Sequence, residues 1–398
     1  MIKKTAFLIF VMVLAALFAH SQTEVDERAV IRFDKGLGFH APDTTFGLNL
    51  RFRIQNRMGV MGIQNSGDYI DEVEARIRRL RLRIDGYTKN HRLTYYLQLS
   101  FSRDDQDWDG SKVPNIIRDA MVYYNFSEKF YIGFGQSKLP GNRQRIISSG
   151  QLQFADRSLV NAAFNIDRDF GLFMYFSDAI GGFAYNLKGA VSGGEGRNQL
   201  KSDNGLAYTG RIELMPLGRF TNDGDFSEGD LVRELTPKLS LAAGYSFNHK
   251  TIRNAGQRGA FLHDARDIQT LYGDILFKYM GWAWTAEWMK RIAGDPVTFS
   301  AELPPVYILT GKGFNTQLSH YFSNAWEVAA RFSWLEPDTK VSHYEPRRSE
   351  YTLGATRYIY NHKVKVQANI TYGQRQAFGT DGAEKKYLNA QVQVELGI

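Results

Sequence analysis

The chain has 398 residues, a formal net charge of +7 and no cysteine, and aromatic side chains make up 14% of its residues. The lack of cysteine excludes disulfides and thiolate chemistry. Beyond residue 21, no apolar run approaches the roughly 18 residues of a membrane-spanning helix, so the sequence also excludes a helical membrane protein.

The N-terminus has the pattern of a secretory signal peptide. Lys3 and Lys4 precede an apolar run at residues 5–18, and the small residues Ala19 and Ser21 occupy the −3 and −1 positions before Gln22. We therefore predict a signal peptide at residues 1–21, in preference to a buried N-terminal helix. Export argues against nucleic acid as a partner.

Residues 22–44 separate this signal from the first long alternating segment. Two short stretches, 30–33 and 38–39, predict a small hairpin there.

The stretch ARIRRLRLRID (75–85) packs five arginines into eight positions. A helix would give one apolar stripe backed by a basic face, as in helices that bind nucleic acid or membrane surfaces. A strand would instead place Leu80 and Leu82 on one face and Arg79 and Arg81 on the other. The rest of the chain decides between the two.

A period of two recurs along the whole chain. In 46–60, apolar residues take the even positions and polar ones most odd positions, which is the pattern of a strand with two chemically opposed faces. Sixteen such segments are predicted, near 45–61, 76–88, 91–103, 116–127, 129–138, 168–177, 182–192, 205–214, 237–248, 267–279, 281–291, 312–323, 325–335, 350–360, 363–374 and 386–398.

Their connections alternate between short and long, with one exception: 215–236 is long where a short turn is expected. An even number of strands with this alternation is typical of an outer-membrane β-barrel. Closure removes sheet edges that a bilayer would not tolerate. A soluble β-sandwich also alternates, but sixteen strands are many for one sandwich. We therefore predict an all-β, transmembrane antiparallel barrel over 45–398, with 22–44 on its periplasmic side.

In this barrel the arginine-rich stretch 75–85 is predicted to be a strand. Leu80, Leu82 and Ile84 face lipid, and the arginines at 79, 81 and 83 face the lumen. Arg76 and Arg78 precede a phase change in the alternation. This change indicates either a bulge or the end of the strand at the mouth of the barrel.

Several blocks resemble the phosphate-selective porin O and P family: RRLRLRIDG (78–86), LTYYLQLSF (93–101), GQSKLPGNRQRIISSGQLQFADRSLVN (135–161), DRDFG (167–171) and TPKLSLAAGYSFN (236–248). The resemblance implies a sixteen-stranded barrel, commonly a homotrimer, with an arginine-lined pore that favours anions. It also implies that the third long loop, here 139–167, folds into the lumen as a constriction.

The candidate anion-guiding residues form two groups. Arginine suits this role because its charge is permanent and its planar fork can donate two hydrogen bonds to phosphate. The first group lies on the first two strands: Arg51, Arg53, Arg57, Arg78, Arg79, Arg81 and Arg83. The second lies in or beside the constriction loop: Lys138, Arg143, Arg145, Arg157 and Arg168.

A structural role is the alternative for both groups, because barrel lumens are polar and basic residues often pair with acids across the channel. The acids available for such pairing are Asp85, Asp119, Asp156, Asp167, Asp169, Glu213, Asp274 and Glu287.

No catalytic, metal or cofactor site is predicted. DDQDWDG (104–110) starts like a calcium loop, but Ile116 stands where an EF-hand needs glutamate, so we interpret it as an acidic external loop. No nucleophile motif or catalytic triad is visible. The sequence thus predicts a passive outer-membrane channel for small anions, with phosphate or phosphorylated solutes as candidates. The alternatives are a barrel with a docking or structural role and little conductance, and an outer-membrane hydrolase.

Overall fold

The computed structural model describes residues 30–33, 36–43, 45–89, 91–106, 114–199, 205–376 and 384–398. The predicted signal peptide lies outside these residues. In the described part of the chain, no helix is long and apolar enough to cross a membrane.

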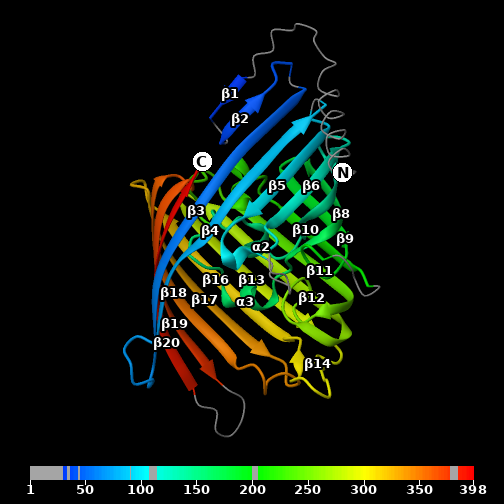
Figure 1. Ribbon diagram of the computed structural model, residues 1–398. Helices are drawn as coiled ribbons and strands as arrows, with labels where there is room; N and C mark the ends of the chain where they lie inside the picture. The colour runs from blue at the N-terminus through cyan, green and yellow to red at the C-terminus, as the bar shows by residue number, and fades with distance from the viewer. Residues whose placement is uncertain are drawn as a thin grey trace, which may run out of the picture.

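Sixteen antiparallel strands form one closed barrel, as predicted (Figure 1). Each strand pairs with the next, and β20 closes the ring on β3 from Tyr387↔Ile63 to Gly397↔Arg53. The strands are β3 (Phe46–Ile63), β4 (Glu72–Thr88), β5 (Leu93–Ser100), β6 (Ile117–Asn125), β7 (Phe130–Lys138), β8 (Arg168–Ile180), β9 (Phe183–Ser192), β10 (Ala207–Met215), β11 (Lys238–Arg253), β12 (Phe261–Tyr279), β13 (Trp282–Ile292), β16 (Gly311–Tyr321), β17 (Trp326–Pro337), β18 (Arg347–Tyr360), β19 (Val364–Gln376) and β20 (Glu384–Gly397).

The period of two appears directly as alternating burial. Along β10, Thr209, Arg211 and Glu213 point inward and are buried, whereas Tyr208 and Ile212 point outward and are about half exposed. An apolar outer face suits lipid, and a polar inner face suits an aqueous or hydrogen-bonded interior.

The bulge predicted near Arg78 is confirmed. In the β3–β4 ladder Gln55 pairs with Arg79 and Asn56 with Ile77, which leaves Arg78 as an extra residue. A bulge shifts the alternation by one position. The arginines on both sides of it can therefore face the lumen, while Ile77 faces outward with 54% of its surface exposed.

β3 and β4 extend beyond the other strands at the short-turn end of the barrel, where the C-terminus lies (Figure 1). The predicted hairpin, β1 (Val30–Arg32) and β2 (Leu37–His40), lies beside them. β2 pairs with β3 from Leu37↔Leu50 to His40↔Gly47, beyond the point where β20 ends. It thereby covers an edge of β3 that would otherwise be unpaired.

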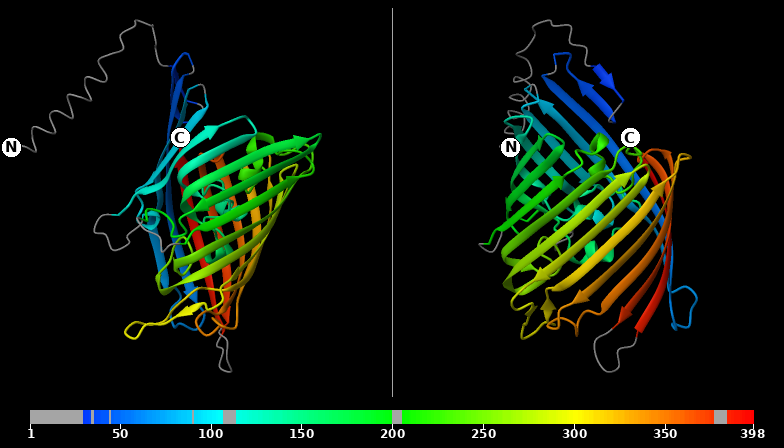
Figure 2. Two further views of the ribbon diagram at one scale, coloured as in Figure 1. Left: turned by 90° about the vertical axis from the view of Figure 1, so that its right-hand side faces the viewer. Right: turned by 180° about the vertical axis from the view of Figure 1, so that it is seen from behind.

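Two segments fold into the barrel (Figure 2). The first, residues 139–167, is called the inserted loop and carries the short helices α2 (Arg143–Ile146) and α3 (Leu159–Phe164). The second, residues 216–237, is called the floor segment; it connects β10 to β11 at the short-turn end and carries η2 (Thr221–Phe226). The remaining elements are η1 (Arg103–Asp105) and the hairpin β14 (Val297–Thr298) with β15 (Val306–Tyr307).

A small apolar core holds the inserted loop against the barrel wall. Val160 and Phe164 of α3 belong to one buried cluster with Met289 of β13 and Leu335 of β17. A Cβ on Gly313 would lie 3.0 Å from both methyl carbons of Val160, so the glycine lets the helix approach the wall. The loop therefore packs on one side of the lumen, along β10 to β19.

Candidate functional site

The other side of the lumen contains a cavity of about 1690 Å³. The inner faces of β3–β8 and the exposed face of the inserted loop form its middle. Its lining runs from Tyr87 and His91 near the short-turn end to Tyr307 and Tyr387 near the long-loop end. The cavity thus follows the barrel from one mouth towards the other.

Cations dominate the lining of this cavity. Among the described residues, sixteen arginines and two lysines line it, against five aspartates and two glutamates. All five arginines of the stretch 75–85 are among them, because the bulge at Arg78 turns both parts of β4 towards the lumen. The surplus of cations makes the lining strongly electropositive.

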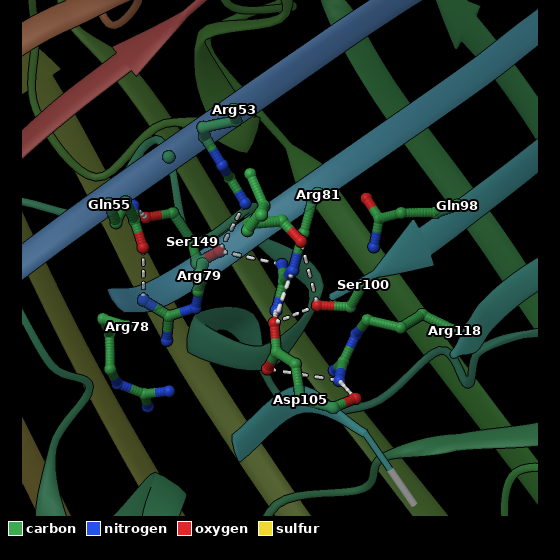
Figure 3. Close-up of polar contacts among 12 residues, drawn as sticks. Arg53, Gln55, Arg78, Arg79, Arg81, Gln98, Ser100, Asp105, Arg118 and Ser149 are labelled. Carbon is green, nitrogen blue, oxygen red and sulfur yellow. Dashed lines mark hydrogen bonds and ion pairs between the residues drawn. The ribbon is translucent and has the colours of Figure 1, made fainter. Parts of the chain in front are cut away.

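Two arginines share one carboxylate at the centre of the lining (Figure 3). Arg81 of β4 donates from Nε to Asp105 Oδ2 at 2.6 Å, and Arg118 of β6 lies 3.2 Å from Asp105 Oδ1. Ser149 of the inserted loop accepts a bond from Arg81 at 3.1 Å. Asp105 belongs to the stretch interpreted above as an acidic external loop; the structure instead turns it inward. Most of the rest of that stretch, residues 107–110, lies outside the described residues.

A second bulge explains why the sequence pattern missed Arg118. Gln98 pairs with Asp119 and Leu99 with Ile117, so Arg118 is an extra residue in the β5–β6 ladder. Strict alternation would send either Arg118 or Asp119 to the lipid face. The bulge brings both into the lumen.

Other lining arginines also meet carboxylates. Arg168 donates from Nε to Asp119 Oδ1 at 2.8 Å, and Arg145 pairs with Asp167. Nearer the long-loop end, Arg57 bonds Glu74 at 2.7 Å and pairs with Asp156, which also lies 3.5 Å from Arg78. At the other end, Arg83 donates to Asp85 at 2.8 Å. These pairs fix the guanidinium groups in position.

Some lining cations are held by neutral acceptors instead, and three of these are among the residues predicted from the sequence. Arg79 donates to the Gln55 side chain at 2.6 Å. Lys138 donates to the carbonyls of Ile146 (2.9 Å) and Ile147 (3.2 Å). Arg157 donates to the carbonyls of Gln144 (2.5 Å) and Ile147 (2.8 Å).

No carboxylate of the described residues lies within ion-pair distance of Arg79, Lys138 or Arg157. Carbonyl and amide oxygens orient a cation without neutralising it. Burial, and then the nearby Arg145, lower the pKa of Arg157 to about 9, so this side chain remains a cation at pH 7.

Nine of the twelve residues predicted from the sequence line the cavity: Arg57, Arg78, Arg79, Arg81, Arg83, Lys138, Arg145, Arg157 and Arg168. Arg51, Arg53 and Arg143 do not line it. Arg51 pairs with Asp85, and Arg53 lies behind the inserted loop, where it bonds Ser149. Arg143 is 1% exposed because it bonds Asp274 and Ser240 of the opposite wall.

Tyrosines replace arginines towards the short-turn end. The inner faces of the neighbouring strands β5–β8 carry Tyr96, Tyr123, Tyr131 and Tyr175. The rings of Tyr131 and Tyr175 stack with centroids 4.6 Å apart. Inward-facing aromatic residues at period two were available in the sequence, but a search for charged residues alone passes over them.

The filled side of the lumen, along β10 to β19, is a buried polar core. Arg211 bonds Glu213 (2.7 Å), Asp274 (2.7 Å) and the carbonyl of Gly141 (3.2 Å). Lys365 donates to the carbonyl of Leu152 at 2.9 Å. These residues attach the inserted loop to the wall and have no access to the cavity.

A family model for phosphate-selective porin O and P matches residues 48–396. The chain belongs to this family of outer-membrane porins. The porin is therefore a channel protein rather than an enzyme, and it resides in the outer membrane of a Gram-negative bacterium. A curated relative from Aquifex aeolicus (strain VF5), described as an uncharacterized protein, is 22% identical over 82% of each chain.

Solved porins share the fold. The outer membrane channel DcaP of Acinetobacter baumannii is 13% identical, with a TM-score of 0.55 over 91% of this chain and 99% of its own. The anion-selective porin from Comamonas acidovorans is 11% identical, with a TM-score of 0.54 over 88% and 100%. OprB of Pseudomonas putida is 10% identical, with a TM-score of 0.55 over 89% and 95%. At these identities the likeness extends to the fold alone.

Proposed function

We propose that the porin is a passive diffusion channel that prefers anions, with phosphate or phosphorylated solutes among them. The observation that supports this most is the charge of the lining, where eighteen cations face seven carboxylates in the part of the chain that the structure describes. Rings of arginine and lysine at a constriction favour anions. The Comamonas neighbour is described as anion-selective, which agrees with the proposal.

The mechanism has two steps. The electropositive cavity enriches anions at its mouth. An anion then exchanges between successive cations, and conduction requires that each site bind weakly enough to release it. Arg79, Lys138 and Arg157 suit this exchange, because neutral oxygens hold them in place and leave their charge available.

The proposed orientation follows from loop length. In outer-membrane barrels, short turns face the periplasm and long loops face the exterior. The hairpin β1–β2 and the floor segment then lie on the periplasmic side, and anions reach the inserted loop from outside. We also propose a homotrimer in the outer-membrane lipid, as the family resemblance implies; cross-linking in membranes and native mass measurement test it.

The reversal potential of the purified porin in a planar bilayer tests the main proposal. Under a potassium chloride gradient we expect anion preference, and added phosphate should reduce or saturate the chloride current. Arg79→Ala and Arg145→Ala should weaken both effects. Cation preference would contradict the proposal, and an absence of channels would favour a docking or structural barrel.

A further inference from the structure

The floor segment, 216–237, occupies a position where the other connections of this end are short turns such as 280–281 and 322–325. It crosses the short-turn end of the lumen: the Ser227 hydroxyl lies 3.2 Å from His362 Nε2, in the turn between β18 and β19. Glu228, Asp230 and Glu234 are at most 3% exposed. The part of the segment around these residues is buried and has contacts on both of its faces, whereas Leu217 and Leu235 are exposed.

One face is anchored to the barrel wall. The buried ammonium of Lys278 on β12 donates to three carbonyls of the segment, those of Gly224 (2.7 Å), Ser227 (2.9 Å) and Gly229 (2.6 Å). Asp230 accepts a bond from the backbone nitrogen of Gly281 at 2.8 Å. These bonds fix the segment around residue 228 to the rigid part of the fold.

The other face contacts the inserted loop through Glu228. Its carboxylate accepts bonds from the Gln144 side chain (3.1 Å) and the Gln153 backbone nitrogen (2.8 Å). Its own backbone nitrogen donates to the carbonyl of Gln151 at 3.1 Å. Glu228 therefore touches the loop at three points, and each donor to its carboxylate is neutral.

The part of the loop that Glu228 holds also holds two cations of the cavity. The carbonyl of Gln144 accepts from Arg157. The carbonyl of Ile147, at the end of α2, accepts from both Arg157 and Lys138. A connected path of hydrogen bonds thus runs from the wall through the floor segment and α2 to the lining.

We propose that Glu228 is a positioning residue for the pore, and that the floor segment sets the constriction from the short-turn end by fixing α2 and, through it, Lys138 and Arg157. The selectivity part of this inference rests on the proposed anion path. The conductance part does not, because a loop that is free to move alters the width of the cavity whatever ion it conducts.

Single-channel recording of Glu228→Ala tests the inference. The variant removes both carboxylate bonds, so we expect a different open-channel conductance and increased open-channel noise. Because the variant also removes a negative charge, its anion-to-cation permeability ratio is compared with that of Glu228→Gln, which removes the same charge but keeps one acceptor oxygen; displacement of Lys138 and Arg157 should make the ratio of Glu228→Ala the lower of the two. Glu302→Ala, which removes an exposed carboxylate on a long loop, is the matched control and should behave like wild type.

A covalent link provides a reversible version of the test. Residues 151 and 228 share a backbone hydrogen bond of 3.1 Å, which makes them neighbours that an engineered disulfide can be tried on, and the chain has no native cysteine. In Gln151→Cys/Glu228→Cys, oxidation should restore wild-type conductance and noise, and reductant should return the behaviour of Glu228→Ala.

Identical recordings for Glu228→Ala and Glu302→Ala would overturn the inference, as would a linked variant that does not respond to reductant. If Glu228→Ala does not assemble, Glu228→Gln, which keeps the volume and one acceptor oxygen, takes its place and should give intermediate noise. A wild-type channel without anion preference would refute the proposed function, while the conductance and reductant measurements would still decide the role of Glu228.

Discussion

The two sides of the lumen use the same residue types differently. On the filled side, Arg211 meets two carboxylates and a carbonyl, and the inserted loop covers it completely. On the open side, Arg81 and Arg118 share Asp105, and Arg79 bonds only the Gln55 amide among the residues that the structure describes. Both sets face inward on barrel strands. Cover by the inserted loop separates a structural arginine from a pore arginine; the number of carboxylates does not, because Arg57 of the cavity lining also pairs with two.

The largest expected effect is on the filled side. Arg211→Ala would remove the cation that Glu213 and Asp274 share. Lys188 and Arg143 would still pair with these carboxylates, so we expect a cost of about 3 kcal/mol in the free energy of unfolding, at the low end for breaking a buried ion pair. Arg83→Ala on the open side, where the guanidinium is 41% exposed, should cost less than about 1 kcal/mol. Urea titration of the barrel in lipid vesicles measures both. Equal losses of unfolding free energy in the two variants would contradict the distinction between the filled and the open side.

A single deletion tests the bulge. Removing Ile77 would make the β3–β4 ladder regular and place Arg78 opposite Asn56, on the lipid face, where a charge costs up to about 2–4 kcal/mol, depending on depth. We expect poor assembly, measured as the heat-modifiable fraction on a gel. Arg78→Ala keeps the register and should assemble normally; if the deletion assembles as well as it does, the bulge does not control the facing of these residues.

On the open side, substitution of Lys138 allows the effect of charge on selectivity to be measured apart from any effect on stability. Lys138→Gln removes a cation that only carbonyls hold, so we expect a fall of about twofold in the anion-to-cation permeability ratio. The free energy of unfolding should change by less than about 1 kcal/mol, because no ion pair is broken. Reversal potentials measure the first and urea titration the second. Lys138→Arg keeps the charge and should retain the ratio; a loss there would show that shape rather than charge matters.

The smallest expected effect is that of pH on Asp156 of the inserted loop. Burial opposes its ionisation, but Arg57 and Arg78 outweigh burial and lower the pKa to about 2. The contribution of this carboxylate to stability is therefore complete above its ordinary pKa of 3.8 and is lost as the pH falls through 2.

Asp156 therefore stays ionised from pH 8 to about pH 4 and should not change the anion preference over this range. The preference should rise as Asp156 is neutralised near pH 2. Asp156→Asn should show the higher preference already at pH 7, in reversal potentials against wild type. A wild-type transition near pH 4 that Asp156→Asn lacks would show that Arg57 and Arg78 do not control this carboxylate.

The sequence by itself determined the barrel and much of its lining. Lipid outside and a polar interior impose a period of two on every strand, so the sixteen segments and the inward arginines of β4 could be read from the sequence. The phase change at Arg78 marked the bulge. The resemblance, rather than the alternation, implied that 139–167 folds inward.

Only the tertiary structure decided which inward cations meet the cavity. Arg143 and Arg145 are two residues apart, yet one is bound to Asp274 of the far wall and the other lines the cavity. The bulge at Arg118, the inward turn of Asp105 and the contact of Glu228 with Gln144 also gave no sequence signal. Each depends on contacts in the lumen between segments that are far apart in the chain. The alternation along one strand shows which face a residue is on, but not what lies opposite it.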